Sequence, residues 1–236
     1  MAQIEYSGKD ILEVMRGARR YNQYLVDLVL GYARQGDVIM DFGAGAGTFA
    51  APVAVAGHCV VCIETDPDLC VILRQQGLEV SDSIDAIADF SVDYIYSLNV
   101  LEHIEDDQAI LAAWHRKLRP GGRITIYVPA FPSLYTSMDR KVGHVRRYTK
   151  QELIEKVSLA GFDVARARYA DSLGYLATLL YKYSGKQDGS VDEAMLRLYD
   201  QYIFPVSRLI DCVAGAVIGK NLVVQAVKGA AKDAAA

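Results

Sequence analysis

The 236-residue sequence predicts one α/β domain in which helices cover both faces of a parallel sheet. Short apolar runs of strand length alternate with segments of helical length along residues 38–128. The first run ends in Asp41, and glycines follow at positions 43, 45 and 47. This pattern indicates a buried strand followed by a turn in which the backbone comes very close to another group.

Each element follows from local patterning. The predicted strands are 38–42, 59–64, 78–80, 92–98, 123–128, 162–169 and a closing strand at 221–227. The predicted helices are 11–32, 47–56, 67–75, 107–118 and 150–160. Pro67 suits the first turn of the helix 67–75. Gly161 is expected to end the helix 150–160. The first helix has a polar centre that is expected to bend or break it.

The chain then divides into four expected parts. Residues 1–34 form an N-terminal helical cap, and 35–170 form the core. Residues 171–220 form an apolar helical insertion between the sixth and seventh strands. Residues 221–236 form the last strand and a frayed tail. A turn is expected at 119–122 and a long connection at 129–148.

Composition and charge exclude several classes. An apolar content of 52% excludes a disordered chain, and a net charge of −4 does not favour general nucleic-acid binding. No apolar run is long enough to span a membrane, and the first residues lack the features of a signal peptide. A cytoplasmic location is therefore expected. Cys59 and Cys62 should point to opposite faces of one strand, so no metal site is expected.

The glycine turn indicates a nucleoside site. Glu64 ends the second apolar run, 21 residues after Gly43, where an acid commonly binds ribose hydroxyls. A dinucleotide site would have glycine at position 48, but this chain has Thr48. Asp41 would also repel a pyrophosphate, whereas it would attract an ammonium group. The pattern favours a ligand with a nucleoside at one end and a cation at the other, and S-adenosylmethionine is such a ligand.

Several motifs resemble those of class I S-adenosylmethionine-dependent methyltransferases. They are Asp41-x-Gly43-x-Gly45-x-Gly47, Glu64, the segment 93–103 and the turn 118–122. Residues 143–149 and 159–162 are similar to a ubiquinone/menaquinone-biosynthesis-like group of that family. The resemblance covers roughly residues 35–170. It implies a Rossmann-like, doubly wound sheet of seven strands whose antiparallel last strand lies beside the sixth.

The resemblance also implies roles for particular residues. Glu64 would hold the ribose, the glycine loop would lie along the methionine, and Asp82 would meet the adenine. The cofactor-binding residues implied are Tyr21, Asp41, Gly43, Ala44, Gly45, Gly47, Glu64, Thr65, Asp82, Ser83, Leu98 and Asn99. A turn-forming role for Asn99 and a capping role for Asp41 are the structural alternatives.

The residues of the acceptor site are expected in the connection after the fifth strand. His144 and His103 are the histidines able to reach the crevice as general bases, although either could be structural. Arg146 and Arg147 form either a solvated basic face or an anion clamp. The expected substrate-binding residues are Tyr135, Arg146, Arg147, Tyr148 and Tyr175.

The function predicted is methyl transfer from S-adenosyl-L-methionine to a small, partly apolar metabolite or lipid-like acceptor, at O, N or C. The acceptor could carry an anionic group. The alternatives are a non-catalytic S-adenosylmethionine-binding scaffold, an RNA or protein methyltransferase, and a nicotinamide oxidoreductase. No nucleic-acid partner is expected. Residues 171–220 are expected to roof the acceptor, to pair two subunits in a homodimer, or to touch a membrane surface.

Overall fold

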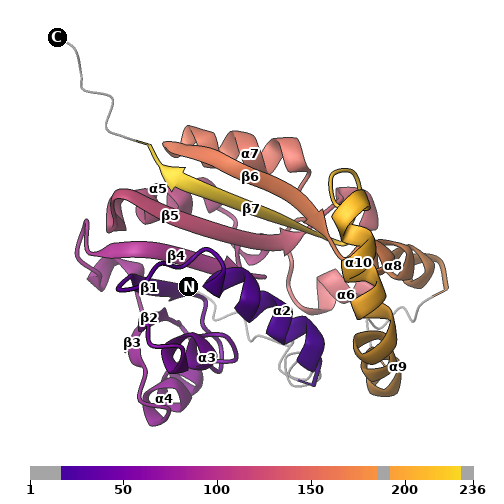
Figure 1. Ribbon diagram of the computed structural model, residues 1–236, viewed down its shortest axis with the longest axis horizontal. Coiled ribbons are helices and arrows are strands. Elements are labelled where there is room, and N and C mark those ends of the chain that lie inside the picture. Colours follow the sequence, from indigo (N-terminus) through magenta and orange to yellow (C-terminus); the bar gives the residue numbers. More distant parts are fainter. Residues whose placement is uncertain (1–16, 185–191, 230–236) are drawn as a thin grey trace.

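The computed structural model describes residues 17–184 and 192–229, and these form a three-layer α/β structure around one sheet (Figure 1). The strand order within the described residues is β3-β2-β1-β4-β5-β7-β6. The strands are β1 (Val38–Phe42), β2 (Cys59–Ile63), β3 (Glu79–Ser81), β4 (Val92–Leu98), β5 (Leu118–Pro129), β6 (Phe162–Ala170) and β7 (Asn221–Lys228). All neighbours are parallel except that β7 runs antiparallel to both β5 and β6. This confirms the predicted Rossmann-like sheet with an antiparallel last strand.

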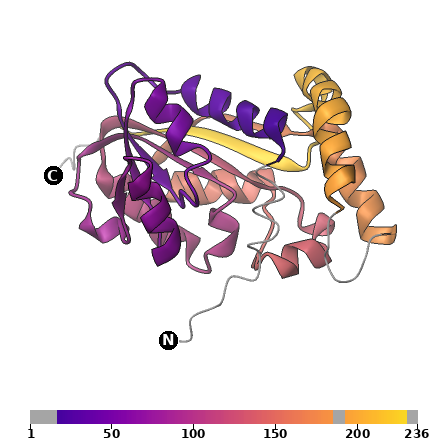
Figure 2. The ribbon, with the colours of Figure 1, turned by 90° about the horizontal axis from the view of Figure 1, so that it is seen from below.

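Helices cover both faces of the sheet (Figure 2), and an apolar core lies on each face. One face is covered by α2 (Arg19–Leu30), α3 (Ala50–Val55) and α4 (Pro67–Gln75), through buried residues such as Leu25, Val53 and Leu73. The other is covered by α5 (Asp107–Lys117) and α7 (Lys150–Leu159), through Trp114 and Leu153. The strands between them are buried on both faces, which explains their continuous apolar runs.

The remaining helices gather beyond the carboxyl ends of the parallel strands (Figure 1). They are α6 (Ser137–Lys141), α8 (Ser172–Ser184), α9 (Glu193–Leu198), a π-helical turn η4 (Tyr199–Ile203) and α10 (Phe204–Ala214), with short 3₁₀ turns η1 (Ile84–Ala86), η2 (Leu101–His103) and η3 (Pro132–Leu134). The described residues of the segment between β6 and β7 are thus mainly helical, as predicted. Residues 185–191 of that segment, 11–16 of the predicted first helix and 230–236 of the predicted tail lie outside the described residues.

Two predicted boundaries were wrong. The helix expected from residue 47 begins at Ala50, because Gly47 has φ +81° and cannot be helical. The strand expected from Arg123 begins at Leu118, which pairs with Val92 across an irregularity in the register. The residues expected to form a separate turn therefore belong to β5.

Short polar side chains fix where helices begin. Asp66 accepts hydrogen bonds from the backbone N–H groups of Asp68 and Leu69 at the start of α4, and Pro67 takes the first position. Asp106 begins α5 in the same way, and Thr149 begins α7. The sequence therefore sets these boundaries locally, before any packing is considered.

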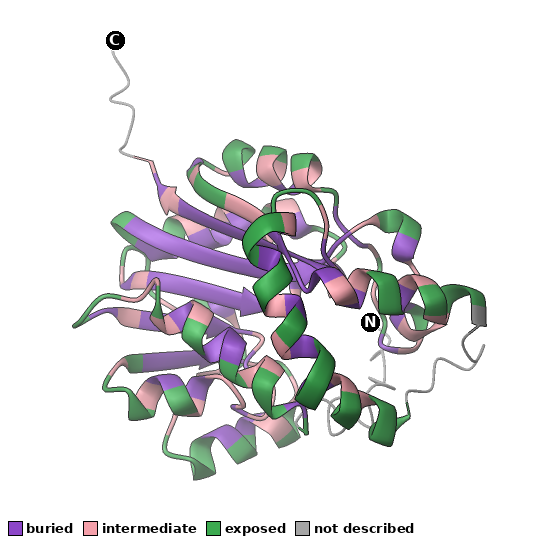
Figure 3. Ribbon diagram, turned by 45° about the vertical axis from the view of Figure 1, so that its right-hand side comes forward, coloured by how far each residue is buried: buried purple, intermediate pink, exposed green. Residues whose placement is uncertain are grey.

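The α8–α10 group has many exposed residues (Figure 3), and several of them are large and apolar. Leu180 is 69% exposed, Leu209 is 74% exposed and Val213 is 86% exposed. Within the described residues, no helix combines the length and hydropathy needed to cross a membrane.

A buried ion pair ties the segment after α2 to β5. The Nη2 of Arg123 donates to Oδ2 of Asp37 at 2.5 Å, and Nη1 donates to the carbonyl of Tyr32 at 3.0 Å. The two side chains of the pair are 4% and 9% exposed. Removal of the guanidinium would leave a buried carboxylate without its counter-charge.

We expect Arg123→Met to lower the free energy of unfolding by about 3–5 kcal/mol, because Asp37 stays buried without its partner. Urea titration measures the change. Arg119→Met is the matched control: Arg119 pairs with Asp93 at 2.6 Å but is 45% exposed, so the expected loss is below about 1 kcal/mol. Equal losses in the two variants would contradict the buried pair's role.

Candidate functional site

The backbone turns sharply where β1, β4, β5 and β6 end on one edge of the sheet. Gly43 after β1 has φ +80° and Asn99 after β4 has φ +56°. Phe131 beyond β5 has φ +58°, and Asp171 after β6 has φ +62°. The left-handed region is unfavourable for residues other than glycine and asparagine, and such residues cluster at functional sites. In parallel sheets, ligands bind at this carboxyl edge.

The three glycines of the loop after β1 differ in how much space a side chain would have at each position. A Cβ on Gly43 would lie 2.5 Å from Val100 Cγ2, and one on Gly47 would lie 2.6 Å from Gln76 Oε1. A Cβ on Gly45 would meet nothing within 4 Å, although its φ is +57°. Packing against Val100 therefore requires glycine at position 43. At position 47 the φ of +81° is the main constraint, because the amide of Gln76 ends a flexible side chain. Gly45 leaves open space beside the loop. Ala44 between them is buried.

Glu64 joins this loop to the end of β2. Its Oε2 accepts a hydrogen bond from the N–H of Gly45 at 2.7 Å, and its Oε1 accepts from the N–H groups of Thr65 at 2.8 Å and Asp66 at 2.9 Å. Three of the residues predicted to bind the cofactor, Gly45, Glu64 and Thr65, are thus brought together.

Asp41 is a buried acid at the base of the same loop. Its side chain accepts a hydrogen bond from the hydroxyl of Tyr96 at 2.8 Å, and the residue is 2% exposed. Burial raises the pKa of Asp41 to about 7, because the charged form loses its hydration. A cation placed beside this carboxyl group would reverse that shift.

The end of β4 meets the N-terminal helix. Asn99 Nδ2 donates to the hydroxyl of Tyr21 at 3.4 Å, and Leu98 before it is buried. Asp200 of the π-helical turn accepts from the N–H groups of Arg20 and Tyr21 and so caps the start of α2. The predicted neighbours Tyr21 and Asn99 are therefore in contact.

Asp82 and Ser83 lie at the end of β3, two strands from β1. Asp82 is exposed, and Ser83 accepts a hydrogen bond from the N–H of Asp85 and begins η1. The hydrogen bonds among the described residues do not connect either residue to the glycine loop. Their predicted contact with the adenine stays a prediction.

The two candidate histidines contact each other. The rings of His103 and His144 are 4.7 Å apart, edge to face. His144 Nδ1 lies 2.7 Å from Asp139 Oδ1, and this histidine and Arg147 hold the pKa of Asp139 well below its ordinary value despite its burial. Nδ1 of His144 is therefore the protonated nitrogen, and Nε2 carries the lone pair. Burial and the neighbouring His144 lower the pKa of His103 to about 4, which keeps it neutral.

Asp139 is a site residue that sequence reasoning missed. It caps α6 together with Thr136, whose N–H and hydroxyl both donate to Asp139 Oδ2. The Thr136-x-x-Asp139 spacing is typical of a capping box and could have indicated this helix start. The partnership with His144 has no such signal.

The basic residues of the loop do not form an open clamp in this structure. Arg147 is 3% exposed and makes two hydrogen bonds to Asp139, at 2.8 Å and 2.9 Å. Arg146 donates to Asp107 Oδ2 at 2.9 Å. Tyr148 is fully buried, and its hydroxyl also donates to Asp107. Arg147 and Tyr148 are thus buried within the loop, and the guanidinium of Arg146 is engaged by Asp107. The predicted contact of these residues with an acceptor stays a prediction.

Aromatic side chains line the same edge. The Tyr135 hydroxyl donates to the carbonyl of His144 at 2.6 Å. Tyr175 on α8 meets the ring of Phe131 edge to face at 5.2 Å, and Phe131 stacks on Tyr169 at 4.8 Å. Tyr135 and Tyr175 thus lie in the predicted region, and Phe131 and Tyr169 were not anticipated.

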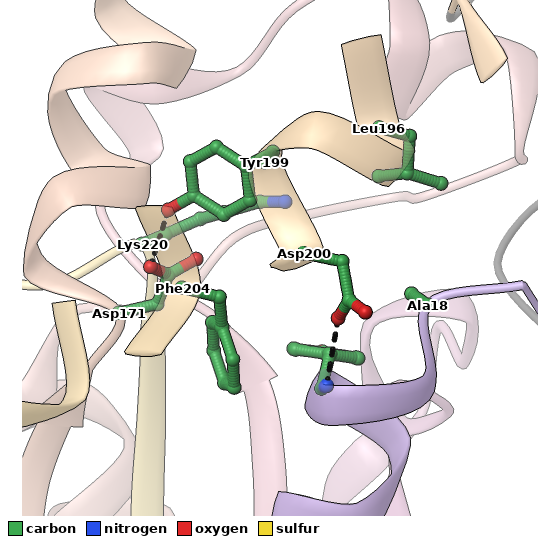
Figure 4. A pocket seen from close by; sticks show the side chains of 8 residues that line it. Ala18, Asp171, Leu196, Tyr199, Asp200, Phe204 and Lys220 are labelled. Carbon is green, nitrogen blue, oxygen red and sulfur yellow. Dashed lines mark hydrogen bonds between the residues drawn. The ribbon is translucent and has the colours of Figure 1, made fainter. Parts of the chain in front are cut away.

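A small cavity of about 30 Å³ lies between the start of α2, the π-helical turn and the end of β6 (Figure 4). Tyr21, Tyr199 and Lys220 are among the residues that line it. Asp171 Oδ1 at its wall accepts from the Tyr199 hydroxyl at 2.5 Å and from Ser207 Oγ at 2.8 Å. Burial lowers the pKa of Lys220. The cavity has room for about two water molecules and is too small for an acceptor.

Comparisons with known proteins bear on this site. A family model described as a methyltransferase domain matches residues 15–167. A ubiquinone biosynthesis O-methyltransferase of Xanthomonas oryzae pv. oryzae is 32% identical over 96 residues, which are 36% of this chain and 40% of that protein. The match therefore spans well under half of this relative. A probable S-adenosylmethionine-dependent methyltransferase of Mycolicibacterium smegmatis is 26% identical over 71% of this chain and 66% of its own length.

Solved structures share the fold. A putative methyltransferase in complex with the Haloferax volcanii Trm112 activator has a TM-score of 0.66 at 16% identity, covering 97% of this chain and 99% of that one. A possible histamine N-methyltransferase of Thermotoga maritima has a TM-score of 0.63 at 15% identity, covering 93% and 95%. With the family model matching well over half of its length, the chain belongs to the methyltransferase domain family, and its fold is that of class I S-adenosylmethionine-dependent methyltransferases.

Proposed function

We propose that this methyltransferase acts on a small, partly apolar acceptor whose reacting atom lies beside His103 and His144. The observation that carries the proposal is the position of these imidazoles. His103 follows Asn99, at the end of β4, by four residues, and His144 packs against it at 4.7 Å. Polar groups able to act on a proton thus lie next to the residues expected to hold the methyl donor.

The residues at the glycine loop fit S-adenosyl-L-methionine. The space beside Gly45 admits a ligand against the backbone, and Asp41 is a carboxyl group whose pKa is raised by burial. When bound, the cofactor supplies an electrophilic methyl group. In our proposal Asp41 faces its ammonium group, Glu64 its ribose, and Thr65, Asp82 and Ser83 its adenine. Tyr21 and Asn99 cover the methionine end.

The protein's part in direct displacement is to align the acceptor and exclude water. A base is needed only where the nucleophile must lose a proton. Asp139 accepts a hydrogen bond from Nδ1–H of His144, so Nε2 is the atom of His144 proposed to take a proton from the acceptor. The buried network of Asp139 and Arg147 keeps the imidazole in one orientation.

The surroundings favour an acceptor with an apolar part. Phe131, Tyr169 and Tyr175 form an aromatic wall on this edge, and the α8–α10 group is proposed to roof it rather than to pair subunits or touch a membrane. The name of the Xanthomonas relative supports a lipid-like acceptor. Arg146 and Arg147 remain the cations proposed to meet an anionic group of the acceptor, although in this structure each is paired with a carboxylate.

Incubation of the protein with cell extract and deuteromethyl-labelled cofactor, followed by mass spectrometry, tests the acceptor class. The proposal requires a labelled small molecule with an apolar portion. Tight cofactor binding without a labelled product would favour a non-catalytic scaffold, and label in RNA or protein would contradict the acceptor class.

Gly45→Ala is expected to raise the Kd for S-adenosylmethionine at least about tenfold, a loss of about 1.4 kcal/mol, because the methyl group enters the ligand's space. Gly36→Ala is the control, since Gly36 has φ +84° and also meets nothing within 4 Å. Both changes should lower the free energy of unfolding by about 1–2 kcal/mol through backbone strain. Calorimetry of cofactor binding separates the two, and equal affinities would refute the placement of the ligand.

The affinity for S-adenosylmethionine is expected to rise about fivefold between pH 6 and 7.5. Asp41 ionises through a pKa of about 7, while the cofactor's ammonium, with an ordinary pKa of about 8, stays largely charged. Stability changes in the opposite sense: a carboxyl group whose pKa is raised by folding stabilises the fold below about pH 4, and this contribution is lost as the pH rises through about 7. Asp41→Asn should flatten the affinity profile, and an unchanged slope would exclude this residue.

His144→Gln is expected to lower kcat about 100-fold or more while the Kd for the cofactor changes less than about twofold. His115→Gln is the control, because His115 lies on α5 against Phe162, with ring centroids 5.2 Å apart. Single-turnover kinetics with the identified acceptor measures the effect. A kcat within about threefold of the parent would remove His144 from the reaction.

A further inference from the structure

Glu102 is a buried carboxyl group with a missing partner. It is 0% exposed, and within the described residues neither of its carboxylate oxygens has a hydrogen-bond partner. Nε2 of His144 lies 3.6 Å from Oε1, which is too far for a hydrogen bond. The guanidinium of Arg147 is engaged by Asp139. A buried carboxylate without a hydrogen-bond partner is costly in its charged form unless a cation lies beside it.

Two imidazoles complete the surroundings of this carboxyl group. His144 donates from Nδ1 to Asp139 and keeps its lone pair on Nε2, which lies on the Glu102 side. His103 Nδ1 lies 3.3 Å from the carbonyl of Gly143, which can only accept, so its lone pair is on Nε2. One potential ligand atom from each of Glu102, His103 and His144 lies within 4.8 Å of the other two.

We infer that Glu102, His103 and His144 form a binding site for one divalent transition-metal ion. Two imidazoles and a carboxylate make up the ligand set of catalytic zinc sites with an open fourth position. In tetrahedral zinc sites with metal–ligand distances of about 2.1 Å, two ligand atoms lie about 3.4 Å apart. The distance between His144 Nε2 and Glu102 Oε1 is close to this value, at 3.6 Å. Imidazole ligands favour zinc and its neighbours over Mg²⁺, which prefers oxygen.

Asp139 has the role of the outer partner that metal-bound histidines usually have. It receives Nδ1–H of His144 and thereby fixes the tautomer and the direction of Nε2. The site rests on these contacts alone; only its consequence for methyl transfer rests on the proposed function. With the ion bound, Nε2 of His144 is a ligand, and the ion, not a free imidazole, would lower the pKa of an acceptor hydroxyl.

The test uses the full chain with Cys59→Ser and Cys212→Ser, because both thiols are exposed and could bind zinc themselves. The untagged protein is stripped with a chelator, dialysed, and titrated with ZnCl₂ in a calorimeter, without cofactor or acceptor. We expect one ion per chain. At 100 times its Kd, zinc should raise the Tm by about 5 °C or more, while MgCl₂ at the same concentration should not.

Glu102→Gln and His144→Gln should each weaken zinc binding at least about tenfold. Without metal, Glu102→Gln should keep the Tm of the parent, because the amide is uncharged, as the buried acid with its raised pKa mainly is near pH 7. An unchanged Tm shows that the variant folds. His115→Gln should bind zinc as the parent does. Zinc binding that survives both site variants, or no stabilisation by zinc, would overturn the inference. Because the readout contains no acceptor, failure here leaves the proposed methyl transfer standing, and the reverse also holds.

Discussion

The backbone at the carboxyl edge must reverse after each parallel strand, and after β1, β4, β5 and β6 this chain does so through left-handed residues. Gly43 adopts such a conformation at no steric cost, and Asn99 does so at little. Phe131 and Asp171 adopt it only because their surroundings hold them there: Phe131 between Tyr169 and Tyr175, and Asp171 by hydrogen bonds through its carboxyl group. These turns aim the loops toward one place, so the site depends on them.

Asp139 plays the corresponding part in the connection after β5. A single buried carboxylate caps α6, pairs with Arg147 and orients His144. Removal of any one partner would leave the others charged or unpaired in a dry environment. The loop therefore holds its histidine with the rigidity of a core element, although it has little regular structure. Such support is what a catalytic or ligating side chain needs.

The order of elements and the cofactor loop could be predicted from the sequence, because strand periodicity, helix caps and glycine spacing are local signals. Gly45, Glu64 and Thr65, which the motif singles out, are hydrogen-bonded together, and their contact with the cofactor stays a prediction. The rest depends on contacts between distant residues. Arg147 looked like a free cation but is buried against Asp139, and Glu102 and His144 are brought together across 42 positions of the chain. Nothing local marks Phe131 or Asp171 as left-handed, since neither residue type favours that conformation as glycine does.

The antiparallel strand β7 has a consequence for how the molecule is made. It is synthesised after the other six strands, yet it lies between β5 and β6 and pairs with both along most of their length. A nascent chain that has completed β6 therefore carries two open sheet edges with unpaired backbone groups. Only the emergence of residues 221–228 closes them. Between the completion of β6 and the emergence of β7, chaperones have the most open backbone to protect from aggregation.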